Sequence, residues 1–313
     1  MPGNKQKRSG ATWHGKAIAL AAIVLAAILS DLLYDRLGQR SAVVEASAGS
    51  LRLDLTRELN GKFFENAIVC RRQEDDAPIQ HDALYGCSGR THMLTPPRNT
   101  DEQVGRENVN LTLPAGTSIL LSARPGLVRL SVISVPDAYA DSDAARLVGG
   151  AIILDESAIP AFGTLTMTGR AVIGAGQSQT DLLAVTQGGY QFSGWTPTAL
   201  LDGQWRMLRN GALLSGSTVY FPGRDSDAEG PFGQPVAQTR LTVSVPDPAT
   251  SLLQVTAISA EGPMALKIFY FSTEPLTVRP SITDVLLADP ILTFLATLIL
   301  GLIAIYEFLR SRD

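Results

Sequence analysis

The chain has 313 residues, of which 45% are hydrophobic and 18% are charged, and its formal net charge is −4 at pH 7. This length can bury a sizeable core, and the low charge with ordinary apolar content excludes a disordered chain. The negative charge argues against a nucleic-acid binder, which presents a basic face, and two cysteines are too few for a disulfide-rich scaffold or a four-thiolate zinc site.

The first element is an apolar run from Ala17 to Leu29 that continues to Tyr34. Four basic residues and no acidic residue precede it, so we predict a transmembrane helix over 17–34 and a cytoplasmic basic tail over 1–16. A cleaved signal peptide is the alternative interpretation. Its nearest small-residue cleavage motif begins at Ala46, seventeen residues beyond Leu29, which is too far for such a site.

A second apolar run begins at Pro290, a residue suited to the first turn of a helix. Two arginines follow the run, which predicts a transmembrane helix over 290–306 and a cytoplasmic tail over 307–313. Small residues let membrane helices approach closely, so Ala22, Ala26 and Gly301 are candidate helix-packing positions. The alternative for the two alanines is that alanine is simply common in this chain.

Residues 35–289 lie between the two spans and read mostly as strands. We predict a mainly β fold: a periplasmic antiparallel β-sandwich or barrel-like domain flanked by the two transmembrane helices. Period-two alternation predicts strands at Leu51–Thr56, Val128–Val132, Leu165–Thr168 and Arg240–Val245. Turns are predicted at Pro125-Gly126, Gly149-Gly150, Gly188-Gly189, Pro222-Gly223 and Gly262-Pro263. A short helix is expected around Leu55–Asn66.

One internal similarity bears on domain organisation. The stretches Arg129–Asp137 and Arg240–Asp247 both read as a strand that ends in Val-Pro-Asp. Two duplicated subdomains would explain the similarity. The alternative is that Pro-Asp is a common strand terminator, because proline presets a turn dihedral and aspartate bonds the backbone ahead of it.

The two cysteines, Cys70 and Cys87, both fall in the region predicted to be exported. In an oxidising compartment they are expected to form a disulfide around a polar loop. A metal site that adds His81 and His92 is the alternative, but it lacks the ligand spacing of known metal motifs.

Candidate catalytic residues are few. Asp225, Asp227 and Glu229 match the first half of a calcium loop, but Val236 stands where the bidentate glutamate should be, so a solvated acidic turn is the better interpretation. The sequence contains no nucleophile elbow, nucleotide-binding loop or haem motif. We therefore assign no catalytic, cofactor-binding or metal-binding residue.

These patterns predict a function outside the cytoplasm, because the tails are too short to fold as domains. Arginine outnumbers lysine 21 to 5, which is typical of a GC-rich bacterial genome. We predict a non-enzymatic inner-membrane accessory or scaffold subunit of a cell-envelope complex, with other envelope or inner-membrane proteins as partners and no nucleic acid or nucleotide. A periplasmic ligand-binding or sensing module is the first alternative. A hydrolase that uses paired carboxylates on an envelope polymer, with Asp225, Asp227 and Glu229 as suspects, is the second.

Overall fold

The fold is given by a computed structural model of the chain. It describes residues 40–72, 92–94, 106–174, 184–196, 205–223, 236–247, 249, 252–259, 265–270, 274–291, 293–294, 297–298 and 301.

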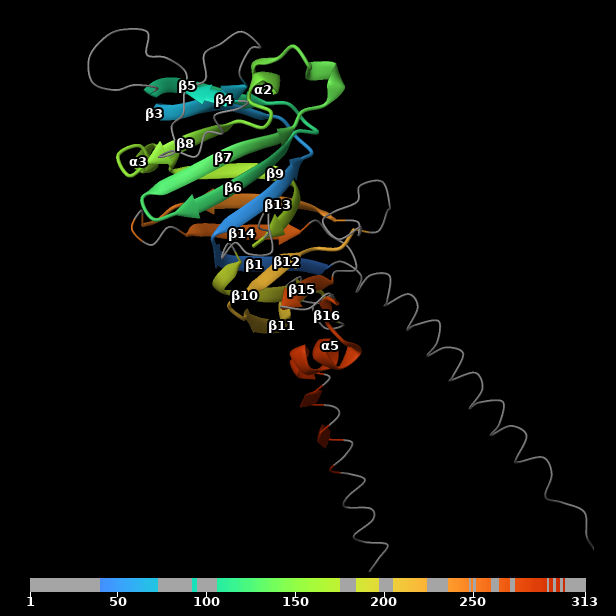
Figure 1. The fold of residues 1–313 in the computed structure, drawn as a ribbon. Coiled ribbons are helices and arrows are strands. Elements are labelled where there is room, and N and C mark those ends of the chain that lie inside the picture. The colour runs from blue at the N-terminus through green and yellow to red at the C-terminus, as the bar shows by residue number, and fades with distance from the viewer. Residues whose placement is uncertain are drawn as a thin grey trace, which may run out of the picture.

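Most of the described chain is β-strand (Figure 1). The strands are β1 (Arg40–Ala48), β2 (Ser50–Leu55), β3 (Leu59–Arg72), β4 (His92–Leu94), β5 (Arg106–Leu113), β6 (Ser118–Arg124), β7 (Leu127–Ser134), β8 (Ala151–Asp155), β9 (Thr164–Ile173), β10 (Val185–Gly194), β11 (Arg206–Leu213), β12 (Ser217–Tyr220), β13 (Gln238–Ser244), β14 (Leu253–Ser259), β15 (Leu266–Tyr270) and β16 (Leu276–Val278). The helices are η1 (Asp137–Tyr139), α2 (Asp143–Arg146), α3 (Ile159–Phe162) and α5 (Ile282–Ala288). The prediction of a mainly β, antiparallel fold is confirmed.

All of these strands belong to one sheet in which every strand ladder is antiparallel. The order runs β16-β15-β12-β10-β1-β14-β13-β9-β2-β6-β7-β8-β3-β4, with β11 beside β10 and β5 beside β3. Because β12 also pairs with β9, the six strands β9, β13, β14, β1, β10 and β12 close into a ring. The chain therefore curls one sheet around its core.

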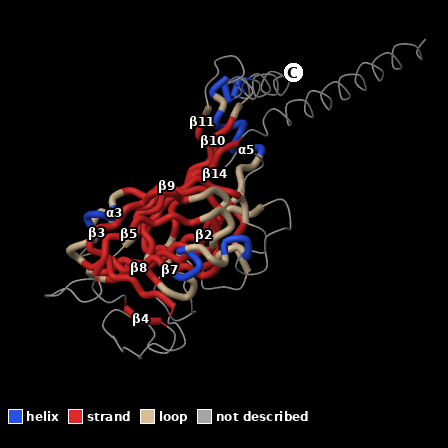
Figure 2. Tube along the Cα trace, turned by 90° about the horizontal axis from the view of Figure 1, so that it is seen from above, coloured by secondary structure: helices blue, strands red, loops and turns tan. Residues whose placement is uncertain are grey.

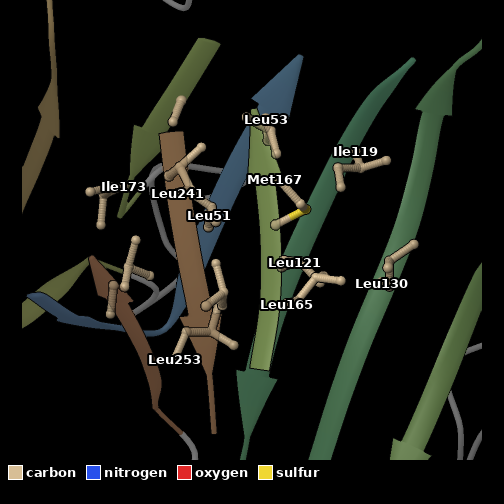
Figure 3. Close-up of a cluster of buried hydrophobic side chains, with 14 of the residues drawn as sticks. Leu51, Leu53, Ile119, Leu121, Leu130, Leu165, Met167, Ile173, Leu241 and Leu253 are labelled. Atoms are coloured by element: carbon tan, nitrogen blue, oxygen red, sulfur yellow. The ribbon is translucent and has the colours of Figure 1, made fainter. Parts of the chain in front are cut away.

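The core follows from the period-two alternation of the sequence. In β2, Leu51, Leu53 and Leu55 are buried while the residues between them are partly exposed, because successive side chains of a strand point to opposite faces. Figure 3 shows the same inward direction for side chains from six neighbouring strands. The labelled residues are Leu51, Leu53, Ile119, Leu121, Leu130, Leu165, Met167, Ile173, Leu241 and Leu253. All four strands predicted from alternation are confirmed as β2, β7, β9 and β13, although β2 ends one residue before Thr56 and β13 one residue before Val245.

The helix expected around Leu55–Asn66 is wrong. Residues from Leu59 onward form β3, which pairs with β5 through two irregularities in register. Gly61 and Asn66 have positive φ angles of 68° and 58°. This left-handed backbone is incompatible with a helix and bends the strand at those two places.

Among the described residues, no helix is long and apolar enough to cross a membrane. The first predicted span, 17–34, and both tails lie outside the described residues. The second, 290–306, is described only in part, and residues 290–291, 293–294, 297–298 and 301 are helical. Both spans stay predictions, as does the division of the exported region into two subdomains.

Candidate binding face

Only one of the two cysteines of the predicted disulfide lies among the described residues. Cys70 lies in β3 with 1% of its surface exposed, and it is not a free thiol. Cys87 lies outside the described residues, as does His81, so the pairing of Cys70 with Cys87 stays a prediction.

The other predicted site residues are not brought together by the described structure. Gly301 is helical and exposed, and a Cβ at this position would meet no atom within 4 Å. Ala22 and Ala26 lie outside the described residues, as do Asp225, Asp227 and Glu229. Within the described ranges, no three His, Cys, Asp or Glu side chains are placed to hold a metal ion.

The predicted turn at Gly188-Gly189 is wrong, and the error exposes a feature that the sequence reading missed. Both glycines lie in the middle of β10, between β1 and β11. A Cβ on Gly188 would lie 2.5 Å from the carbonyl oxygen of Glu45, so β1 passes too closely for a side chain there. A Cβ on Gly189 would meet only the Gly211 carbonyl, at 3.3 Å.

A hollow of about 790 Å³ is lined by residues of the strands β14, β1, β10 and β11. Figure 1 shows these four strands in the lower half of the sheet. It lies on the outward face of the sheet, because Val44 and Ala46 of β1 are buried in the core while Glu45 between them is exposed. We call this outward surface of the four strands the polar face.

The strand register explains the hollow. Glu45 pairs with Gly189, and Gly189 pairs with Ala212, so the central row offers a carboxylate followed by two positions with almost no side chain. Longer polar side chains surround this row, including Gln187, Gln191, Asn210 and Gln254. A floor of small residues, with amides, Val43 and Tyr190 around it, leaves a depression open to solvent.

Hydrogen bonds preorganise one side of the rim. The Ser47 hydroxyl donates to Gln254 Oε1 at 2.9 Å, and Gln187 Nε2 donates to the same hydroxyl oxygen at 3.5 Å. Glutamines from β14 and β10 are thereby tied across β1. At the other side, Gln191 Nε2 donates to Ser193 Oγ at 3.2 Å.

The lining defines what the polar face can do. Glutamine and asparagine amides both donate and accept hydrogen bonds, and the serine hydroxyl does the same. Among the described residues of the lining, Glu45 has the one acidic or basic side chain, and its carboxylate accepts only. Such a surface can bind neutral polar groups, whereas acid–base chemistry by paired carboxylates would need a second carboxylate beside Glu45.

A second hollow, of about 610 Å³, contains an ion pair between Arg106 of β5 and Asp155 of β8. Burial raises the pKa of the Asp155 carboxyl, but the hydrogen bonds from Arg106 and Ser157 outweigh burial and hold that pKa below its usual value. Asp155 Oδ1 also accepts from the Ala158 amide just before α3. The pair therefore fixes β5 and the α3 turn to β8, which is a structural role.

Comparison of the chain with protein-family models, with curated proteins and with solved structures found no match.

Proposed function

We propose that this chain is a non-enzymatic accessory or scaffold subunit of a cell-envelope complex, held at the bacterial inner membrane by helices at both ends. Its exported β domain binds a membrane-protein partner through the polar face. The observation that carries the proposal is the hollow over Gly189 and Ala212, whose rim can bind polar groups and whose described residues include one carboxylate, that of Glu45.

The polar face suits a protein partner because its hydrogen-bonding groups are spread over four strands and not buried in an enclosed cavity. Amides at a recessed surface bond backbone and side-chain groups of a partner, and the partner's protruding residue fills the hollow. Two membrane anchors would hold the face close to the bilayer, where a membrane partner is found.

The experiment is site-specific photocrosslinking in intact cells. A photoreactive amino acid replaces Ala212 at the floor of the hollow, and a matched variant carries it at Thr166, an exposed position on β9 outside the hollow. The proposal predicts an adduct with one other membrane protein from position 212 and none from position 166. Equal labelling from both positions, or labelling from neither, would count against it.

A ligand-binding or sensing module is the second candidate, and the size of the hollow favours it. At about 790 Å³ it falls within the range of about 300–1,000 Å³ that is usual for small-molecule sites. Native mass spectrometry of the full chain distinguishes the two functions. A small molecule that stays bound to the wild type and is lost from Ala212→Arg would support this second function.

A further inference from the structure

Exposed apolar side chains gather where β11, β16 and α5 meet. Figures 1 and 2 both show β11 and α5 at the same end of the molecule, and Figure 1 adds β16. The exposed fractions there are 38% for Trp205, 53% for Met207, 65% for Leu276 and 73% for Leu287. We call these four residues, with the elements that carry them, the α5 end.

The α5 end is a fixed surface. Arg209 of β11 forms an ion pair with Asp284 of α5 at 3.6 Å and donates to the Arg279 carbonyl oxygen at 3.2 Å. Ser281 and Asp284 cap the helix reciprocally: the Ser281 hydroxyl accepts from the Asp284 amide, and the Asp284 carboxylate accepts from the Ser281 amide. With Val285 buried, α5 is held in the orientation that exposes Leu287.

Tryptophan is concentrated at the same place. The rings of Trp195 and Trp205 lie 6.1 Å apart. Trp205 directly precedes β11, and Arg206 begins that strand. Indole and guanidinium groups beside exposed aliphatic side chains are typical of residues at a membrane–water interface, where a side chain needs both an apolar body and a polar tip.

Both chain ends leave from this part of the sheet. Arg40, the first described residue, pairs with Gly194 of β10, and Gly194 pairs with Arg206 of β11. At the other end of the chain, α5 is followed, after Asp289, by the helical residues 290 and 291. The described residues from which the chain continues toward the predicted spans 17–34 and 290–306 therefore both lie beside the α5 end.

We propose that the α5 end is a bilayer-docking surface whose apolar side chains lie in the boundary between lipid headgroups and acyl chains. Trp205, Met207, Leu276 and Leu287 enter this boundary, and Arg209 and Arg279 lie at headgroup level. The inference rests on the anchoring part of the proposed function. It adds that the domain is held in one orientation on the membrane.

Fluorescence quenching by brominated phosphatidylcholine in nanodiscs tests the proposal with the full chain. One variant keeps Trp205 alone, with Trp13 and Trp195 changed to Phe. A second carries Leu287→Trp after all three native tryptophans are changed to Phe, so that it reports from α5 independently of the indole beside β11. In this same tryptophan-free background, Tyr139→Trp is the matched control, because Tyr139 is exposed beside α2, at the end far from α5 (Figure 1).

We expect brominated lipid to reduce the emission of Trp205 and of Leu287→Trp by about twofold or more, because interfacial residues lie within about 5–10 Å of the acyl boundary. Tyr139→Trp should keep its emission. A further variant, Phe294→Trp, reports on the predicted span itself. If it is quenched while Trp205 and Leu287→Trp are not, the docking surface is refuted and anchoring stands. If Phe294→Trp is not quenched either, anchoring and docking both fail.

Discussion

Two neighbouring glycines in β10 should differ in how much stability the same substitution removes. In Gly188→Ala, the new Cβ would lie 2.5 Å from the Glu45 carbonyl oxygen and 2.9 Å from Ala46 Cα, and both are backbone atoms of β1 that can move only if the strand moves. In Gly189→Ala, the single close neighbour is the Gly211 carbonyl oxygen at 3.3 Å, which a shift of a few tenths of an ångström relieves.

The magnitudes follow from these contacts. Overpacking of this kind costs about 1–3 kcal/mol, and a contact with backbone belongs at the upper end. Replacing glycine by alanine also restricts the unfolded chain, which stabilises the folded state by about 0.4–1 kcal/mol at either position. We therefore expect Gly188→Ala to lose about 2 kcal/mol of unfolding free energy and Gly189→Ala to stay within about 1 kcal/mol of the wild type.

The assay is thermal or urea unfolding of the detergent-solubilised full chain, with both variants measured beside the wild type. A difference of about 2 kcal/mol corresponds to a Tm lower by about 4 °C or more for Gly188→Ala. Equal stability of the two variants, or the reverse order, would refute the register of β1 and β10, because a slip of one residue exchanges the inward and outward positions.

Three further outcomes can be measured with the same unfolding assay. Asp155→Asn should lower the unfolding free energy by about 1–2 kcal/mol at pH 7. Because the pKa of the Asp155 carboxyl is lower in the folded than in the unfolded chain, this difference from wild type should shrink as the pH falls below about 4 towards the folded pKa. A difference that does not change with pH would contradict the ion pair with Arg106. Phe64→Ala should lower the unfolding free energy by about 3–5 kcal/mol, because the Phe64 ring is buried and stacked on the ring of Phe162. A loss below about 1 kcal/mol would contradict this packing. Reduction should lower stability by about 3 kcal/mol if Cys70 pairs with Cys87, and mass spectrometry of the unreduced peptides would identify any other pairing.

The strands that could be predicted from the sequence are those in which apolar and polar residues alternate regularly. In β2, every second side chain is a leucine that the core buries, so periodicity and burial agree. The same agreement holds in β9 and β13, where Leu165 and Leu241 are buried beside exposed or half-buried neighbours. The alternation of apolar and polar residues involves only neighbouring positions, so one sequence is enough to recognise it.

Both errors occurred where distant strands decide the local structure. Gly188-Gly189 resembles a turn because glycine accepts unusual dihedrals, but its reason here is the close approach of β1, which is more than 140 positions away in the chain. Asn66 falls in the stretch 55–66 for which the sequence predicts a helix, yet its positive φ breaks any helix and bends β3 against β5. No local pattern reports such contacts.

The polar face could not be predicted from the sequence, because it too depends on contacts between distant strands. Its central row joins Glu45, Gly189 and Ala212 from three strands, and none of these residues belongs to a recognisable motif. The order of β1, β10 and β11 brings them together, and that order could not be read from the alternation within each strand. An exposed glutamate paired with a glycine in the middle of the neighbouring strand indicates such a hollow, but only once the order of the strands is known.

The proposed function depends most on the claim that the polar face binds a membrane partner. Mild-detergent co-purification of the tagged full chain from its own membranes tests this claim with three versions of the protein. They are the wild type, Ala212→Arg to fill the hollow, and Thr166→Arg as the same change on exposed sheet outside it. We predict a stoichiometric partner with the wild type and with Thr166→Arg, and its loss with Ala212→Arg. A protein that purifies alone in all three versions, or a partner that Ala212→Arg retains in full, would contradict the account.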